Sequence, residues 1–388
     1  MTLGRDICVA APLLALSVAY CAIAAAAADA LPDEDVEKLP VEVSRCHATT
    51  DGKQVKVRRC VGGMERVEGG PREMLNPFLV FDAYWATEAA DFAGGFPAHP
   101  HRGFLEIRYL LAGRLHHSDG CGGRGTTGAG GAQLFFTGGG GTHEEKTEPH
   151  PAGADRPPGV PGDVMFAGFQ VWLNVPAKDK YRPPTYQSIP ADALPAVSVP
   201  GRKPPNAPPG WSPPPRLLVK VLAGRYGGGK APGPISANYS YTVDGDGFMF
   251  LDVQRLSTAA EPFQVFHNSA AMHAFLYVYG GAVRVGDRDV TAGHFVLLGP
   301  GNFVRVTAVP GPGPSLPVFP HGGPFASFVY LTAPKVHERV FLGPGFALES
   351  EAQLKQAFRD LADGRASRCN GERVDGEKLA WDQDDEDL

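Results

Sequence analysis

The sequence has few cysteines, no large excess of charge of one sign and, after residue 28, no long hydrophobic run. Six cysteines occur in 388 residues and none forms a CxxC pair, which argues against a cysteine-rich structural zinc site. The formal net charge of −6 argues against a nucleic-acid-binding surface as the main function. No later stretch is apolar enough to span a membrane. The absence of a Gly-X-Y period excludes a collagen-like chain.

Glycine and proline are abundant. The 49 glycines and 37 prolines make up more than a fifth of the chain, against an average of about 12%. Both residues break helices, so long helices are disfavoured. Hydrophobic residues at 43% and aromatic residues at 10% are ordinary for a globular core, which excludes disorder throughout. We therefore predict an all-β protein with many turns, and the length suggests two domains.

The N-terminal segment differs from the rest of the chain. Residues 7–28 carry no charge and end in the alanine run Ala24–Ala28, which suits cleavage before Asp29. We predict that residues 1–28 are a secretory signal peptide, which places the protein in the secretory pathway or outside the cell. The alternatives are an uncleaved signal anchor, the one case in which a membrane is a partner, or the first part of a bipartite organelle signal.

The remaining sequence reads as two similar halves. Short apolar strands alternate with Gly- and Pro-rich turns in both halves, which suggests a duplicated β-domain. Eight prolines occur between residues 200 and 215, a composition typical of a stiff linker. The expected units are a domain at 41–198, a linker at 199–215, a domain at 216–365 and an acidic tail at 366–388.

One helix is expected near the end of the second domain. Ser350 and Gln353 have the spacing of a capping box at a helix N-terminus. Apolar residues then recur on one helical face, from Leu354 to Leu361.

Four cysteines remain after the N-terminal segment, enough for two disulfides in an oxidising compartment: Cys46, Cys60, Cys121 and Cys369. Cys46 and Cys60 flank a hairpin expected to turn at Asp51-Gly52. A two-residue turn there would place Cys46 opposite Val57, so we do not expect a Cys46–Cys60 bridge.

Candidate metal ligands concentrate in the first half. His99 and His101 are two apart, and so are His143 and Glu145. Side chains at i and i+2 of a strand point to the same face, so four side chains converge if both strands line one barrel. Three imidazoles and one carboxylate suit a divalent ion such as Fe, Mn, Ni, Co, Cu or Zn.

A longer motif surrounds the first pair. His99 and His101 begin the pattern His-x-His-x4-Glu-x6-Gly, which continues through Glu106 and Gly113 and matches the first half of the cupin signature. The Gly-rich approach to His143 matches its second half. Glu106 therefore competes with Glu145 for the fourth ligand position. Other histidines are expected at the surface or in loops: His116, His117 and His150.

Three segments carry a family resemblance: GFPAHPHRGF, GTTGAGGAQLFFTGGGGTHEE and GFQVWLNVPAKDKY. They resemble the pirin family, and the resemblance covers most of residues 45–365. It implies two facing cupin (jelly-roll) barrels in one chain, with a metal ion, usually iron, in the N-terminal barrel alone. The ligands implied by the resemblance are His99, His101, His143 and Glu145.

The chain departs from the family pattern near these ligands. A glutamate usually follows HPHRGF directly, whereas this chain has Leu105 there and Glu106 next. Gly139 replaces the arginine that the family carries in the stretch before His143, which removes a positive charge and several donors. Ala167 replaces another family histidine. These changes leave the ligands intact and bear on substrate specificity.

The resemblance implies two functional hypotheses. The first is a dioxygenase that uses one divalent ion, Fe(II), on a flavonol-like aromatic molecule such as quercetin, with Glu145 as general base. Phe104, Phe135 and Trp172 are candidate walls of its pocket. The second is a non-catalytic, iron-dependent binding or regulatory protein of the transcription-cofactor or signalling-partner type. We expect a monomer without direct nucleic-acid contact.

Overall fold

The computed structural model describes residues 35–62, 75–157, 160–200, 215–231, 247–258, 260–267, 272–310, 325–367 and 369. The predicted signal segment, most of the predicted linker and the end of the predicted tail lie outside these residues. Within them, no helix has the length and apolar character needed to cross a membrane.

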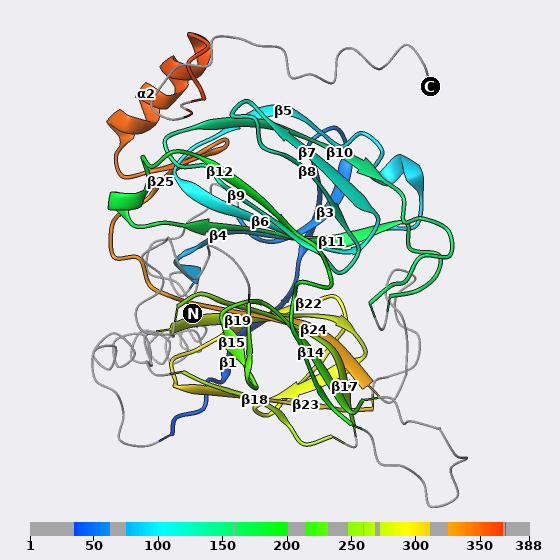
Figure 1. Cartoon of the computed structure of the whole chain (residues 1–388). Coiled ribbons are helices and arrows are strands. Elements are labelled where there is room, and N and C mark those ends of the chain that lie inside the picture. The colour runs from blue at the N-terminus through cyan, green and yellow to red at the C-terminus, as the bar shows by residue number, and fades with distance from the viewer. Residues whose placement is uncertain are drawn as a thin grey trace, which may run out of the picture.

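The first barrel is built from two facing antiparallel sheets, with strand orders β5-β10-β7-β8 and β12-β9-β6-β11-β4-β3-β2 (Figure 1). Its strands are β2 (His47–Asp51), β3 (Val55–Val61), β4 (Phe78–Ala86), β5 (Phe96–His101), β6 (Phe104–Ala112), β7 (Arg114–Asp119), β8 (Arg124–Gly128), β9 (Ala132–Phe136), β10 (Gly141–Glu148), β11 (Phe166–Asn174) and β12 (Thr185–Ile189). Two 3-10 turns, η2 (Ala89–Asp91) and η3 (Ala177–Asp179), interrupt its loops.

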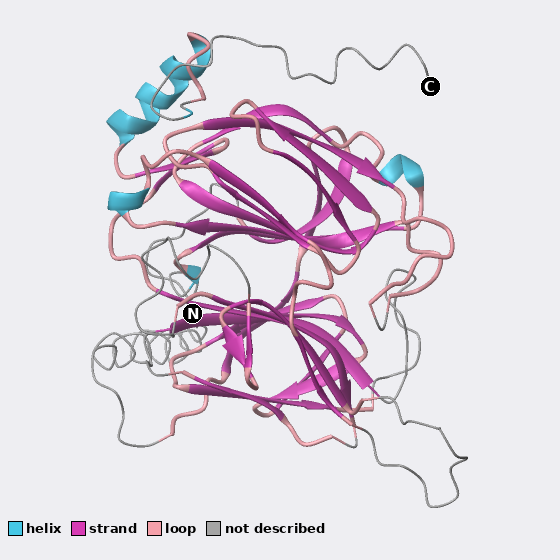
Figure 2. Cartoon of the chain, viewed as in Figure 1, coloured by secondary structure: helices cyan, strands magenta, loops and turns pink. Residues whose placement is uncertain are grey.

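The second barrel repeats this plan, with orders β1-β22-β19-β24-β17-β14-β13 and β18-β23-β20-β21. Its strands are β1 (Pro40–Arg45), β13 (Ala196–Val199), β14 (Leu217–Ala223), β17 (Met249–Ser257), β18 (Phe263–Phe266), β19 (Met272–Gly280), β20 (Ala282–Val285), β21 (Arg288–Thr291), β22 (His294–Leu298), β23 (Phe303–Ala308) and β24 (Phe325–Pro334). A short hairpin, β15 (Arg225–Tyr226) and β16 (Gly229–Lys230), lies beside it. The predicted all-β fold of two barrels is confirmed, and strands dominate Figure 2.

The polypeptide crosses between the two barrels at several of its described segments. β1 pairs with β22, and β13 pairs with β14, so both ends of the expected 41–198 domain belong to the second barrel. The C-terminal hairpin, β25 (Phe341–Gly343) and β26 (Phe346–Leu348), returns to the first barrel, as does helix α2 (Glu351–Ala362) (Figure 1). The backbone N–H groups of Arg102 and Ala347 donate to Gly345 O and Arg102 O at 3.0 and 2.9 Å.

The barrels share one hydrophobic core. The largest buried cluster contains side chains of both seven-stranded sheets. Phe81 of the first barrel meets Phe275 of the second edge-on, with ring centroids 5.0 Å apart. Tyr109 donates a 2.5 Å hydrogen bond across the interface to Asp252 Oδ2. This shared core packs the two barrels tightly against each other and fixes the positions of their strands.

The β2–β3 hairpin corrects one prediction. Asp51 pairs with Val55 across a three-residue loop, and the loop's last residue, Gln54, has a φ of +66°. The loop is one residue longer than predicted and begins one residue later, at Gly52, so the partner of Cys46 moves by three positions, from Val57 to Cys60, and the two cysteines form a disulfide. The expectation that they would not pair was wrong, because it assumed a two-residue turn.

Helix α2 begins where the capping box predicts. Ser350 Oγ accepts a 3.2 Å hydrogen bond from the backbone N–H of Gln353. The predicted apolar face is wrong at its end, because Leu361 is 40% exposed and Asp360 is buried instead. Asp360 accepts a 2.9 Å charge-assisted hydrogen bond from Arg102, next to the histidine pair of β5. The helix is therefore held by an ion pair as well as by apolar packing.

Candidate metal centre

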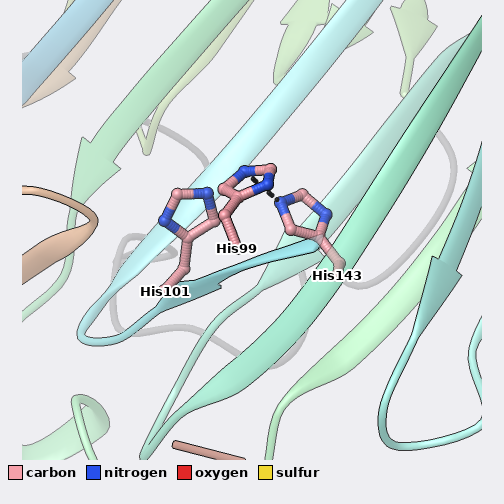
Figure 3. A group of neighbouring side chains, drawn as sticks. All are labelled: His99, His101 and His143. Atoms are coloured by element: carbon pink, nitrogen blue, oxygen red, sulfur yellow. Dashed lines mark hydrogen bonds between the residues drawn. The ribbon is translucent and has the colours of Figure 1, made fainter. Parts of the chain in front are cut away.

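Three predicted ligands meet inside the first barrel. β5 and β10 are neighbours, and their register places His143 opposite His99. The Nε2 atoms of these two residues are 3.0 Å apart, and with His101 they form a group in which one ring nitrogen of each residue lies within 4.8 Å of the other two (Figure 3). The i, i+2 spacing of His99 and His101 thus brings both rings to one side of the sheet, as the sequence predicts.

The three imidazoles are largely shielded from water. His101 and His143 are 2% and 0% exposed, and His99 is half-buried. Burial lowers the pKa of all three, and the mutual proximity of the rings adds to this effect for His101 and His143. The rings are therefore held in the neutral form that binds a metal ion.

Glu106 faces these imidazoles from β6. Its Oε2 atom is 3.5 Å from His143 Nε2 and 3.7 Å from His101 Nε2. Its other oxygen accepts hydrogen bonds from Arg108 Nε at 3.1 Å and Gln170 Nε2 at 2.9 Å. Glu106 is thus anchored through Oε1 and presents Oε2 to the histidines.

Glu145 is held differently. Its Oε2 lies 2.5 Å from Arg108 Nη2, and its Oε1 accepts a hydrogen bond from Gln133. It lies with His117 and His143 in a second group of side chains that could hold a metal ion. Burial raises the pKa of Glu145, and the Arg108 guanidinium opposes this rise. Its predicted roles as ligand and base remain predictions.

The donor set fits a metal ion. His101 Nε2 and Glu106 Oε2 are buried and have no hydrogen-bond partner among the described residues. Buried polar atoms without partners are costly, so their presence together calls for an additional group. Two nitrogens at about 2.1 Å from one ion lie about 3 Å apart at neighbouring corners of its coordination sphere, and His99 and His143 show this separation.

Aromatic side chains pack around the imidazoles. The His101 ring centroid lies 5.1 Å from that of Phe104 and 5.0 Å from that of Trp172. Phe135 stacks on His143 at 4.7 Å. The three aromatics predicted as pocket walls therefore border the site, and they fix the orientation of the rings.

Two buried residues of this region were missed from the sequence. His117 is 1% exposed and contacts His143, although it was expected at the surface. The sequence did carry a signal: His117 is two residues from the apolar Leu115, so on a strand both side chains point to the same face. Arg108 is 1% exposed and binds both glutamates. Its i, i+2 relation to Glu106 on a strand indicates that both point the same way.

Other histidines are used structurally. His150 is also buried, contrary to expectation, and accepts a hydrogen bond from the backbone of Gly113. In the second barrel, His267 Nε2 lies 2.6 Å from Tyr330 Oη, and His273 bonds the carbonyl of Asn76. Among the described residues, both groups of three side chains that could hold a metal ion lie in the first barrel.

The fold and this interior site define the class: a two-barrel cupin protein. The Pirin family model matches residues 55–173. A pirin-like protein of Caulobacter vibrioides is 32% identical over 84% of this chain and 98% of its own length. The chain belongs to the pirin family.

Further relatives extend the comparison. A Vibrio cholerae protein provisionally named quercetin 2,3-dioxygenase is 29% identical over 81% of this chain and 93% of its own length. Human pirin is 27% identical over 81% of this chain and 89% of its own length. The crystal structure of a quercetin 2,3-dioxygenase from Acinetobacter baumannii superposes with a TM-score of 0.62 at 20% identity, covering 85% of this chain and 98% of that one. This last similarity supports the fold.

Proposed function

We propose that the first barrel binds one divalent metal ion, Fe(II), through His99, His101 and His143, with the carboxylate of Glu106 facing them. The supporting observation is a pair of buried atoms without hydrogen-bond partners among the described residues, His101 Nε2 and Glu106 Oε2, which lie 3.7 Å apart at the imidazole cluster. A divalent cation would satisfy both atoms and balance the glutamate charge.

We further propose that the chain is a dioxygenase acting on a flavonol-type aromatic molecule. Relatives provisionally named quercetin 2,3-dioxygenases support this assignment, and so do the aromatic rings that border the histidines. When bound, the metal would act as a Lewis acid and template for the substrate oxygens and dioxygen.

Side chains of the protein supply the proton acceptor, the positioning contacts and the apolar surface for this reaction. Glu145 takes the proton of the substrate hydroxyl, because its carboxylate lies in one group with His143. Arg108 holds Glu106 and Glu145 in place through ion pairs. Phe104 and Trp172, which stack with centroids 4.5 Å apart, present an apolar surface to the substrate rings and exclude water.

The experiment is metal analysis of the purified chain, followed by aerobic loss of quercetin absorbance with Fe(II). The chain should retain about one equivalent of metal, and His101→Ala should retain none. His116→Ala is the matched control, because His116 lies on the same barrel but bonds Thr126 and Glu148. Bound metal without turnover by the Fe, Mn, Ni, Co or Cu forms would exclude the dioxygenase and leave the metal site.

We also propose that the protein matures in the secretory pathway. Two disulfides, Cys46–Cys60 and Cys121–Cys369, support an oxidising compartment. A reporter fused to residues 1–40 should enter that pathway. A reporter that stays cytosolic or nuclear would contradict the proposal and favour a regulatory role.

A further inference from the structure

A buried chain of three side chains leads away from the imidazole cluster. His117 Nδ1 lies 3.3 Å from His143 Nδ1, and His117 Nε2 lies 3.0 Å from Asp119 Oδ2. His117, His143 and Asp119 are 1%, 0% and 5% exposed. β7 pairs with β10 so that Asp119 lies opposite His143, which fixes the chain on two rigid strands.

Asp119 is itself firmly placed. Its Oδ1 accepts backbone hydrogen bonds from Cys121 at 2.8 Å and Gly123 at 2.9 Å. Cys121 is tied by its disulfide to Cys369. The His117 ring stacks on Tyr186, with centroids 3.9 Å apart and planes 5° apart. These contacts hold both Asp119 and His117 in fixed orientations behind His143.

One arrangement of protons on His117 and His143 leaves a nitrogen of His143 able to bind a metal ion. Both Asp119 oxygens accept, so His117 Nε2 must carry the proton that it donates to Oδ2. A neutral His117 then has Nδ1 as an acceptor, and it takes a hydrogen bond from His143 Nδ1–H. His143 Nε2 is left with its lone pair, and this is the atom that faces His99.

We propose that Asp119 and His117 are positioning residues that select the Nδ1–H tautomer of His143 and thereby direct its Nε2 lone pair at the metal position. This inference rests on the metal site proposed above. Residues that donate or accept behind a ligand histidine fix its tautomer and ring orientation, and losing them weakens metal affinity about 10–100-fold.

Asp119→Asn tests the proton order directly. The new Oδ1 still accepts from Cys121 and Gly123, so the turn is kept. The new amide donates to His117 Nε2, which moves the His117 proton to Nδ1 and the His143 proton to Nε2. Co(II) affinity, followed by its visible spectrum, should fall about 10–100-fold. A purely structural Asp119 predicts no change, and that result would overturn the proposal.

His117→Phe provides the matched comparison, because it keeps the stack on Tyr186 and removes the relay. The double variant Asp119→Asn with His117→Phe should bind Co(II) as His117→Phe does, and better than Asp119→Asn alone. Additive losses would overturn the proposal. His117→Asn should recover affinity by restoring an acceptor, and His116→Phe on the outer face should match the wild type.

A second measurement does not depend on metal loading. Nitrogen-15 NMR of the histidine rings in the metal-free protein should show His143 as Nδ1–H in the wild type and as Nε2–H in Asp119→Asn. The same tautomer in both would contradict the inference. Failure of the wild type to bind Co(II) or Fe(II) would instead reject the proposed metal site. A second Co(II) equivalent lost in His117→Phe would make His117 a ligand and overturn its positioning role.

Discussion

The Nη2 atom of Arg108 lies 2.5 Å from Oε2 of Glu145, deep inside the first barrel. The same nitrogen lies 3.1 Å from Glu106 Oε1, so one buried cation serves two carboxylates. Arg108 also donates to Tyr84 Oη at 3.3 Å and lies 4.0 Å from the Phe96 ring centroid. The interior beside the imidazoles is therefore a fixed, charged network whose balance changes when a divalent cation binds.

Removing the positive charge of Arg108 should destabilise the metal-free protein strongly. Arg108→Met leaves two buried carboxylates without their counter-charge, so the free energy of unfolding should fall by about 3–5 kcal/mol in urea titrations. Adding Glu145→Gln to this variant removes one of these charges and should recover part of the loss. If Arg108→Met alone is as stable as the wild type, the prediction is wrong, and water must reach the carboxylates of Glu106 and Glu145.

Replacing Glu106 and replacing Glu145 should have different effects, the first on metal binding and the second on turnover. Glu106→Gln should weaken metal binding, because the carboxylate atom facing His101 and His143 loses its charge. Glu145→Gln should retain the metal and lose turnover, because Glu145 is the proposed proton acceptor. Calorimetric metal titration and quercetin decay on the same samples measure both effects. The reverse pattern would show that Glu145 is the metal ligand, as the family resemblance implies.

Chelation should lower thermal stability. A metal that binds the folded chain alone adds about 2.7 kcal/mol to the free energy of unfolding at 100 times its dissociation constant. Fe(II) or Co(II) should therefore raise the melting temperature of the chelator-treated protein. His101→Leu should abolish this rise, since it removes the buried His101 Nε2, one of the nitrogens proposed to bind the metal. An equal rise in this variant would place the metal elsewhere.

Part of this site follows from sequence alone. Strand alternation brings His99 to His101, and the family pattern adds His143, because both signals are local to two short segments. Which carboxylate faces the imidazoles depends on Arg108, whose contacts join β6 to β10 and follow from the tertiary arrangement. His117 was missed because two adjacent histidines look alike in sequence, and only the buried face of β7 distinguishes them.

The fold shows the same division. Local spacing predicts the strands, the turns and the start of α2. The exchange of β1 into the second barrel was not predicted, because a strand's partner depends on the whole topology. The Cys46–Cys60 disulfide was not predicted, because the length and the position of the β2–β3 loop together set the register of the hairpin, and both differ by one residue from the predicted turn.

The second barrel should contribute to acid sensitivity through His267. Burial lowers the pKa of His267 to about 3, and the Lys38 charge adds to the effect, whereas an unfolded histidine titrates near 6.5. As the pH falls below 6.5, the unfolded chain binds a proton that the folded chain does not. The free energy of unfolding should therefore decrease by up to about 1.4 kcal/mol per pH unit from this group, until the pH approaches 3. His267→Gln should reduce the slope between pH 6 and 4 by about one proton in urea titrations. Tyr330→Phe removes the 2.6 Å hydrogen bond but keeps the imidazole buried, so its slope should match the wild type. An unchanged slope in His267→Gln would show that this histidine takes up its proton without unfolding.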